Sequence, residues 1–124
     1  MIHLDTSFLI GALVPGSPED RLVRSWLRAG EPLAASAIAW TEFLCGPLAG
    51  QEVNLAERLI ASRSPFLDED AELAARLFNE TGRRRGTLAD CMIAATALRE
   101  RAAIATMNVP DFRRFVPFGL ALAG

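Results

Sequence analysis

Met-Ile-His-Leu-Asp-Thr-Ser, residues 1–7, is a short apolar run that ends in a single acidic residue, Asp5. We interpret residues 1–5 as a buried strand and residues 6–13 as a short helix that stops near Pro15. The same order, a short apolar run followed by a helical pattern, recurs along the chain. Short apolar strands that alternate with helices predict an α/β protein with a parallel sheet covered by helices on both faces.

The other elements are predicted from caps, chain breakers and hydrophobic periodicity. Ser17 and Ser36 are expected to cap helices, because a serine hydroxyl can accept from a free amide of the first turn. The predicted helices cover residues 18–29, 37–46, 52–62 and 87–100, and a further helix is capped by Asp68 or Asp70 and runs to about residue 82. The further strands cover 33–35, 66–67, 103–106 and 119–122. We see no repeat or linker, so residues 1–124 are expected to form one domain.

The composition excludes several classes of protein. The formal net charge is −2, so only a local patch could attract nucleic acid. All 13 basic residues are arginine, which excludes mechanisms that need a lysine. No apolar stretch approaches the roughly 20 residues of a membrane span, and no signal peptide is recognised, so a cytoplasmic protein is expected. Cys45 and Cys91 lack zinc-site spacing and are interpreted as buried free thiols.

Three acidic residues, Asp5, Glu42 and Asp90, stand alone in apolar segments that contain no arginine. An ionised carboxylate in an apolar environment is costly unless it is paired or bound to a cation. Three such residues on three separate elements therefore suggest a shared divalent cation, and Mg²⁺ or Mn²⁺ prefer oxygen ligands of this kind. A cation held in this way can activate water and neutralise charge on a phosphate, which is the chemistry of phosphodiester hydrolysis.

Two of the three acids also have simpler interpretations. Asp5 could cap the helix that starts at residue 6, and Asp90 could complete a capping box with Thr87. Glu42 lies in the middle of its predicted helix, far from either cap. Asn108 follows the strand that ends near Thr106, so it is expected beside Asp5 at the carboxyl edge of the sheet.

Over essentially its whole length the chain resembles PIN domains, in particular VapC-type ribonuclease toxins of toxin–antitoxin pairs. Five segments carry the resemblance. They are Ile-His-Leu-Asp-Thr-Ser (2–7), Ala-Trp-Thr-Glu-Phe (39–43), Arg-Gly-Thr-Leu-Ala-Asp-Cys-Met-Ile-Ala-Ala-Thr-Ala (85–97), Thr-Met-Asn-Val-Pro-Asp-Phe (106–112) and Gly-Leu (119–120). It implies a PIN-like three-layer fold with a central parallel sheet of four or five strands flanked by helices. It also implies a metal-dependent endoribonuclease, often acting on transfer or ribosomal RNA.

The resemblance also assigns site residues. It implies that Asp5, Glu42 and Asp90 are catalytic and metal-binding acids, and that Thr6 and Thr106 are hydroxyls that orient carboxylates or water.

At a fourth acidic position many members carry Asp where this chain has Asn108. An amide oxygen can bind Mg²⁺ or its water but adds no charge. Asp111 could compensate, or it could cap a helix before Phe112. A catalytically weak PIN-like scaffold, which binds a protein or RNA without cutting, is therefore the alternative function.

The family resemblance also implies partners. VapC-like proteins imply a homodimer and a cognate antitoxin whose amphipathic segment lies in a groove. More apolar side chains are present than one sheet obviously needs, and they fit either such surfaces or a well-filled core: Leu9, Ile10, Leu13, Trp26, Leu27 and Trp40. The basic run Arg83-Arg84-Arg85 could contact RNA phosphates beside the acidic residues, or complement the dipole at a helix end and stay solvated.

Overall fold

A single parallel sheet of four strands forms the centre of the computed structural model, which describes residues 1–47 and 50–124. The strands lie in the order β3-β2-β1-β4, and Ile2 pairs with Leu33 on one side and with Ala103 on the other. Their bounds are β1 (Ile2–Leu4), β2 (Leu33–Ser36), β3 (Ser62–Ser64) and β4 (Ala103–Ala105). The predicted α/β class with a central parallel sheet is confirmed.

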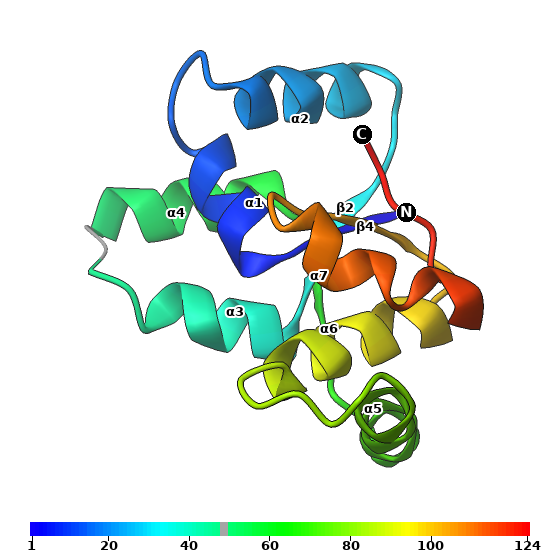
Figure 1. The fold of residues 1–124 in the computed structure, drawn as a ribbon. Helices are drawn as coiled ribbons and strands as arrows, with labels where there is room; N and C mark the ends of the chain where they lie inside the picture. Colours follow the sequence, from blue (N-terminus) through cyan, green and yellow to red (C-terminus); the bar gives the residue numbers. More distant parts are fainter. Residues whose placement is uncertain (48–49) are drawn as a thin grey trace.

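Helices cover both faces of this sheet (Figure 1). Within the described residues they are α1 (Thr6–Ala12), α2 (Pro18–Arg28), α3 (Ala37–Leu44), α4 (Gly50–Leu59), α5 (Asp68–Glu80), α6 (Leu88–Arg99), α7 (Val109–Arg113) and a 3-10 turn (Val116–Phe118). Figure 1 shows α2 and α4 on one side of the strands and α5 and α6 on the other. In the described ranges no helix combines the length and apolar character needed to cross a membrane.

Two hydrophobic cores lie on opposite faces of the sheet, because side chains alternate along each strand. Leu4 and Leu33 point into the first core, where Phe8 of α1 and Val23 of α2 pack against them. Ile104 of β4 points into the second core. Burying a side chain of this size contributes about 1.5–3 kcal/mol, so the two cores fix the strands between the helices.

Two helices are capped at their N-termini by serine hydroxyls, as predicted. The Oγ of Ser17 accepts from the backbone N–H of Asp20, and the Oγ of Ser36 accepts from that of Ala39. The predicted strand at residues 66–67 is wrong, since the third strand is Ser62–Ser64. The predicted last strand is reduced to one bridge between Leu122 and Ile104.

The cysteine interpretation is half right. Cys91 is buried in α6, but Cys45 is exposed at the end of α3.

A buried polar network joins the first strand to α5 and α6. His3 is fully buried, and its Nε2 lies 2.7 Å from Oε1 of Glu100, which also accepts from the Ser64 hydroxyl. Asp70, fully buried in the first turn of α5, accepts from Arg99 Nε at 2.7 Å. Burial by itself raises the pKa of Asp70, but hydrogen bonds led by that from Arg99 outweigh it and hold the pKa below its ordinary value.

Candidate functional site

Three predicted acids meet in one pocket of about 260 Å³ at the carboxyl edge of the sheet. Asp5 directly follows β1, Glu42 comes from α3, and Asp90 lies in the first turn of α6. We call this the acidic pocket, and its lining residues are Asp5, Thr6, Ser7, Ile10, Glu42, Asp90, Ile93 and Asn108. The acids lie 37 and 48 residues apart in the sequence, so only the fold brings them together.

Asp5 is held in place by hydrogen bonds to both of its carboxylate oxygens. Oδ1 accepts from the backbone N–H of Phe8 at 2.9 Å and from the Ser7 hydroxyl at 3.0 Å. Oδ2 accepts from the Thr106 hydroxyl. The simpler interpretation of Asp5 as a helix cap is therefore right, yet the same side chain also lines the pocket. Burial raises its pKa, and the nearby charge of Glu42 adds to that increase, against the hydrogen bonds.

Glu42 lies at the exposed mouth of the pocket. Its Oε1 accepts from the Thr6 hydroxyl at 2.7 Å, which links α3 to the first residue of α1. Because that hydrogen bond fixes one carboxylate oxygen, Glu42 has a defined direction relative to Asp5 even though it is solvent-exposed.

Asp90 does not form the capping box considered above. The hydroxyl of Thr87, the residue before α6, instead donates to the backbone carbonyl of Arg84 at 2.7 Å. Burial raises the pKa of Asp90 to about 6, and the charges of Asp111, Asp5 and Glu42 add to this effect. The guanidinium of Arg114 acts in the opposite direction.

Asn108 lines the pocket, whereas Asp111 is not among the lining residues. The interpretation of Asp111 as a cap before Phe112 is wrong, because α7 already begins at Val109 with Asn108 as its N-cap. Asp111 is close enough for its charge to raise the pKa of Asp90. The pocket therefore contains the amide of Asn108 at the position where many family members carry Asp, and the carboxylate of Asp111 lies near Asp90 without lining the pocket.

Ser7 is a pocket residue that the sequence analysis did not single out. Its hydroxyl donates to Asp5 and accepts from the backbone N–H of Met107 at 3.3 Å, so it joins α1 to the segment after β4. Its place two residues after Asp5 is the only signal in the sequence that could have indicated this contact.

The donor set fits a hydrated divalent cation. In the described part of the chain, no three His, Cys, Asp or Glu side chains converge closely enough to hold an ion by themselves. Mg²⁺ usually keeps several waters and binds through one or two carboxylates, so full convergence is not required. Among the same residues, no arginine forms an ion pair with Asp5, Glu42 or Asp90. Among the described residues, the pocket thus offers carboxylates that form no ion pair, with Arg114 acting on Asp90 only through its nearby charge.

Fold and site together define an α/β protein with an acidic pocket at the carboxyl edge of its parallel sheet. The chain belongs to the PIN domain family, whose model matches residues 2–115. Among functionally curated proteins, none matches the sequence.

Several solved structures share the fold. VapBC2 from Rickettsia felis, bound to a DNA fragment from its promoter, has a TM-score of 0.78 at 20% identity, over 99% of this chain and 98% of that chain. FitAcB from Neisseria gonorrhoeae has a TM-score of 0.70 at 26% identity, over 100% and 97%. A toxin–antitoxin complex from Klebsiella pneumoniae has a TM-score of 0.73 at 25% identity, over 90% of both chains.

Proposed function

We propose that this protein is the VapC-like toxin of a toxin–antitoxin pair and acts as a metal-dependent endoribonuclease. Membership of the PIN family and the similarity to a toxin–antitoxin complex from Klebsiella pneumoniae support the first part. The second part rests on one observation, the gathering of Asp5, Glu42 and Asp90 around one pocket without an ion pair to any described residue. Like charges brought together at a partly buried site are costly, and a divalent cation relieves that cost.

The residues of the acidic pocket have separable roles in this proposal. Asp5, Glu42 and Asp90 would hold Mg²⁺ or Mn²⁺, directly or through water. Such a cation supplies a Lewis acid for the phosphate and lowers the pKa of a bound water. Thr6 and Thr106 act as positioning residues, because each donates a hydrogen bond to one of these acids. Asn108 can add an oxygen ligand or orient water without adding charge.

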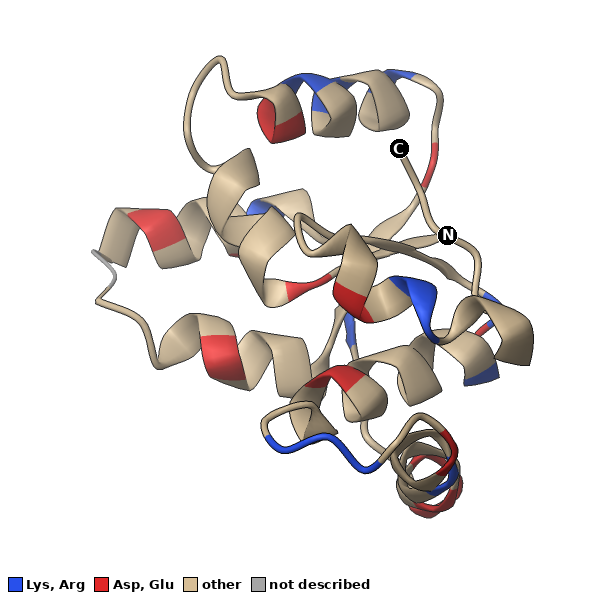
Figure 2. Ribbon diagram, viewed as in Figure 1, with Lys and Arg blue, Asp and Glu red and all other residues tan. Residues whose placement is uncertain are grey.

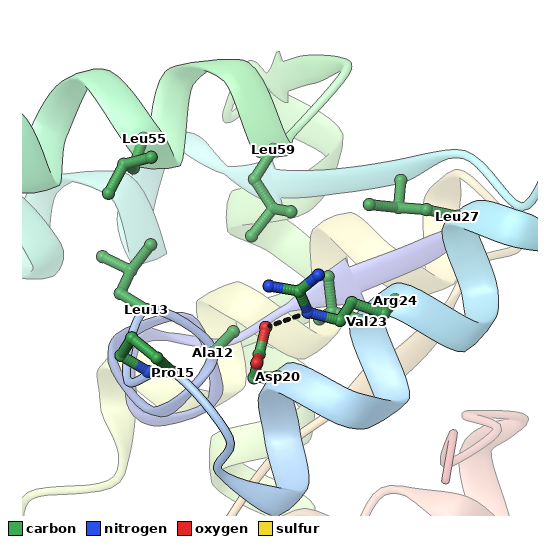
Figure 3. A pocket seen from close by; sticks show the side chains of 9 residues that line it. All are labelled: Ala12, Leu13, Pro15, Asp20, Val23, Arg24, Leu27, Leu55 and Leu59. Carbon is green, nitrogen blue, oxygen red and sulfur yellow. Dashed lines mark hydrogen bonds and ion pairs between the residues drawn. The ribbon is translucent and has the colours of Figure 1, made fainter.

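A second pocket, of about 370 Å³, is the proposed antitoxin site. Figure 3 shows it between α1, α2 and α4, with Leu13, Leu55 and Leu59 around an open apolar space. Arg24 and Asp20 form an ion pair at its side, with Nε and Oδ1 3.0 Å apart. Exposed apolar side chains with a few charges suit an amphipathic segment. An antitoxin is the occupant we propose, because a similar structure is a toxin–antitoxin complex.

The apolar residues that suggested this surface differ in how far they are exposed. Leu9 is fully buried in the first core, while Ile10 and Leu27 are 46% and 47% exposed. Only part of the apparent apolar surplus is therefore available to a partner. The expected homodimer stays a prediction, which sedimentation of the antitoxin-free protein tests.

The decisive experiment incubates purified, antitoxin-free protein with total cellular RNA in Mg²⁺, in Mn²⁺ and in EDTA. We expect cutting that requires the metal and that Asp90→Asn abolishes, because the variant removes one negative ligand from the acidic pocket. The cut sites would show whether transfer RNA, ribosomal RNA or another RNA is the substrate.

Asp68→Asn is the matched control, because Asp68 is an exposed acid at the start of α5 and loses the same charge far from the pocket. It should cut like the wild type. A folded wild-type protein that cuts no RNA in either metal would instead favour the non-catalytic scaffold and direct attention to Asn108.

A further inference from the structure

The loop between α5 and α6, residues 81–87, has a fixed backbone. Gly82, Arg83 and Gly86 have φ values of +94°, +53° and +83°, which is the left-handed region. The backbone N–H of Arg83 donates to the carbonyl of Phe78 at 2.9 Å, which anchors the start of the loop. The Thr87 hydroxyl donates to the carbonyl of Arg84 at 2.7 Å and anchors its end. The loop therefore presents its central side chains from a defined position.

These central side chains carry positive charge that the protein does not neutralise. Arg83 is engaged, since it hydrogen-bonds Asn79 and lies over the ring of Phe78. Arg84 and Arg85 are exposed and form no ion pair with any described residue. Among the described residues, Arg24, Arg76 and Arg99 do pair with acids, at Asp20, Glu80 and Asp70, so Arg84 and Arg85 belong with the arginines that stay unpaired.

The helix-end interpretation of this basic run does not hold. Helix α5 ends at Glu80, and its last turn contains no basic residue. The effect of a helix dipole falls off within the last turn, so Arg84 and Arg85 lie beyond the carbonyls that they would complement. Both side chains are exposed, however, so the other half of that interpretation, a solvated basic run, agrees with the structure.

The loop precedes the helix that carries Asp90, although its residues do not themselves line the acidic pocket. It leads directly into the first turn of α6, which carries Asp90. Five residues of chain span at most about 18 Å, and the turn at Thr87 shortens that path between Arg85 and Asp90. Figure 2 shows the loop in blue beside the start of α6, where the ribbon carries a red acidic segment.

We infer that Arg84 and Arg85 form a phosphate-binding rim, which holds single-stranded RNA a nucleotide or two from the bond placed in the acidic pocket. This inference rests on the proposed nuclease function for the identity of the polyanion. The chain as a whole has a net charge of −2, so affinity for RNA must come from a local patch. Contacts of this kind fix where the backbone lies without reading its sequence.

The test measures binding of a labelled single-stranded RNA across a salt series, in Mg²⁺ and in the Asp90→Asn background so that the RNA stays intact. Each phosphate contact to a single strand contributes a slope of about −0.7 in a plot of log K against log salt. The added changes Arg84→Gln and Arg85→Gln should make the slope shallower by about 1.4, which corresponds to about tenfold weaker binding at 0.15 M salt. Arg84→Lys with Arg85→Lys should keep the wild-type slope.

The matched control is Arg21→Gln with Arg101→Gln, which removes two exposed charges, one from α2 and one from the turn that follows α6. It should change the slope much less. In cleavage assays with Asp90 intact, the Arg84 and Arg85 changes should raise KM and leave kcat unchanged.

Equal weakening by both glutamine pairs, or a loss of kcat at unchanged KM, would overturn the rim. An RNA affinity that neither glutamine pair alters would also overturn it. The same holds if the wild-type protein fails to bind RNA at low salt, or if polyglutamate binds with the same dependence on Arg84 and Arg85. The two proposals fail separately. Loop-dependent binding without any cutting by the wild type would refute the nuclease and keep the rim. If the variant with Arg84→Gln and Arg85→Gln binds and cuts RNA normally, the rim is refuted and the nuclease is kept.

Discussion

Hydroxyl groups, rather than cations, hold two carboxylates of the acidic pocket in place. Ser7 and Thr106 donate to Asp5, and Thr6 donates to Glu42. A neutral donor orients a carboxylate without cancelling its charge, so the negative potential of the pocket is kept for a ligand. This negative environment disfavours the ionised form of Asp90, because burial and its acidic neighbours raise its pKa to about 6.

At the residue scale we predict that Asp90→Asn stabilises the metal-free protein. The folded pKa of Asp90 is about 6 against an ordinary 3.8, so its ionisation opposes folding at neutral pH. The gain should be about 1 to 2 kcal/mol at pH 8, allowing for partial exposure of the side chain. Because the wild type recovers stability as the pH falls through 6 toward 4, the difference between the two proteins should vanish there.

Urea unfolding in EDTA at several pH values measures this difference, with Asp68→Asn as the charge-matched control. Asp68 is exposed at the start of α5. A variant that is less stable than the wild type at pH 8 would show that the carboxylate of Asp90 is favourably paired in the metal-free state.

Among the elements, those with a strong apolar or capping signal were predictable and the polar edge strand was not. Ser17 and Ser36 indicated where α2 and α3 begin, because a cap acts over three residues. The edge strand Ser62–Ser64 pairs through its backbone, which requires no apolar side chain. The predicted strand fell instead on the apolar pair Phe66 and Leu67, but Phe66 is apolar because it packs against the second core.

At the scale of elements we predict that Asp70→Asn weakens the packing of α5 on α6. Asp70 is fully buried and accepts hydrogen bonds from Arg99, from the Thr96 hydroxyl and from the backbone N–H of Leu67. Replacing the charged partner of Arg99 should cost about 2 kcal/mol of the free energy of unfolding near neutral pH.

The pH dependence has the opposite sign to that of Asp90. The folded pKa of Asp70 lies below its ordinary 3.8, so its contribution is present above about pH 4 and is lost as the pH falls through the folded pKa. The difference between Asp70→Asn and the wild type should therefore shrink on acidification. Thermal melts at pH 7 and pH 3 provide the measurement, and a difference that stays constant would mean that the charge of Asp70 is not involved.

In the whole molecule, α1 joins the acidic pocket to the proposed antitoxin site. Its first turn contributes Thr6 and Ser7 to the acidic pocket, while its last residue, Ala12, and the following Leu13 line the apolar pocket. Ile10 also lines the acidic pocket, so the two sites adjoin along one short helix.

On this scale we predict that Leu27→Glu with Leu55→Glu abolishes capture of the cognate antitoxin and leaves RNA cleavage intact. Both leucines are nearly half exposed, at 47% and 46%, so the fold should tolerate the charges. Co-purification with a tagged antitoxin measures capture, and Val116→Glu, at a site 44% exposed in the 3-10 turn, is the control. Retained capture by the double variant would place the antitoxin elsewhere.

The sequence by itself determined the alternation of strands and helices and the three solitary acids, because periodicity, caps and isolated charges act over short stretches of chain. Only the tertiary structure decided which polar groups meet. Thr106 contacts Asp5 across 101 residues, and Arg99 neutralises Asp70 across 29. Asp70 lies in an acid-rich helix start that reads as solvent-exposed, and its burial depends on a partner that only the packing of α5 on α6 supplies. Long-range pairing of this kind follows from how the sheet and helices assemble, and no local pattern encodes it.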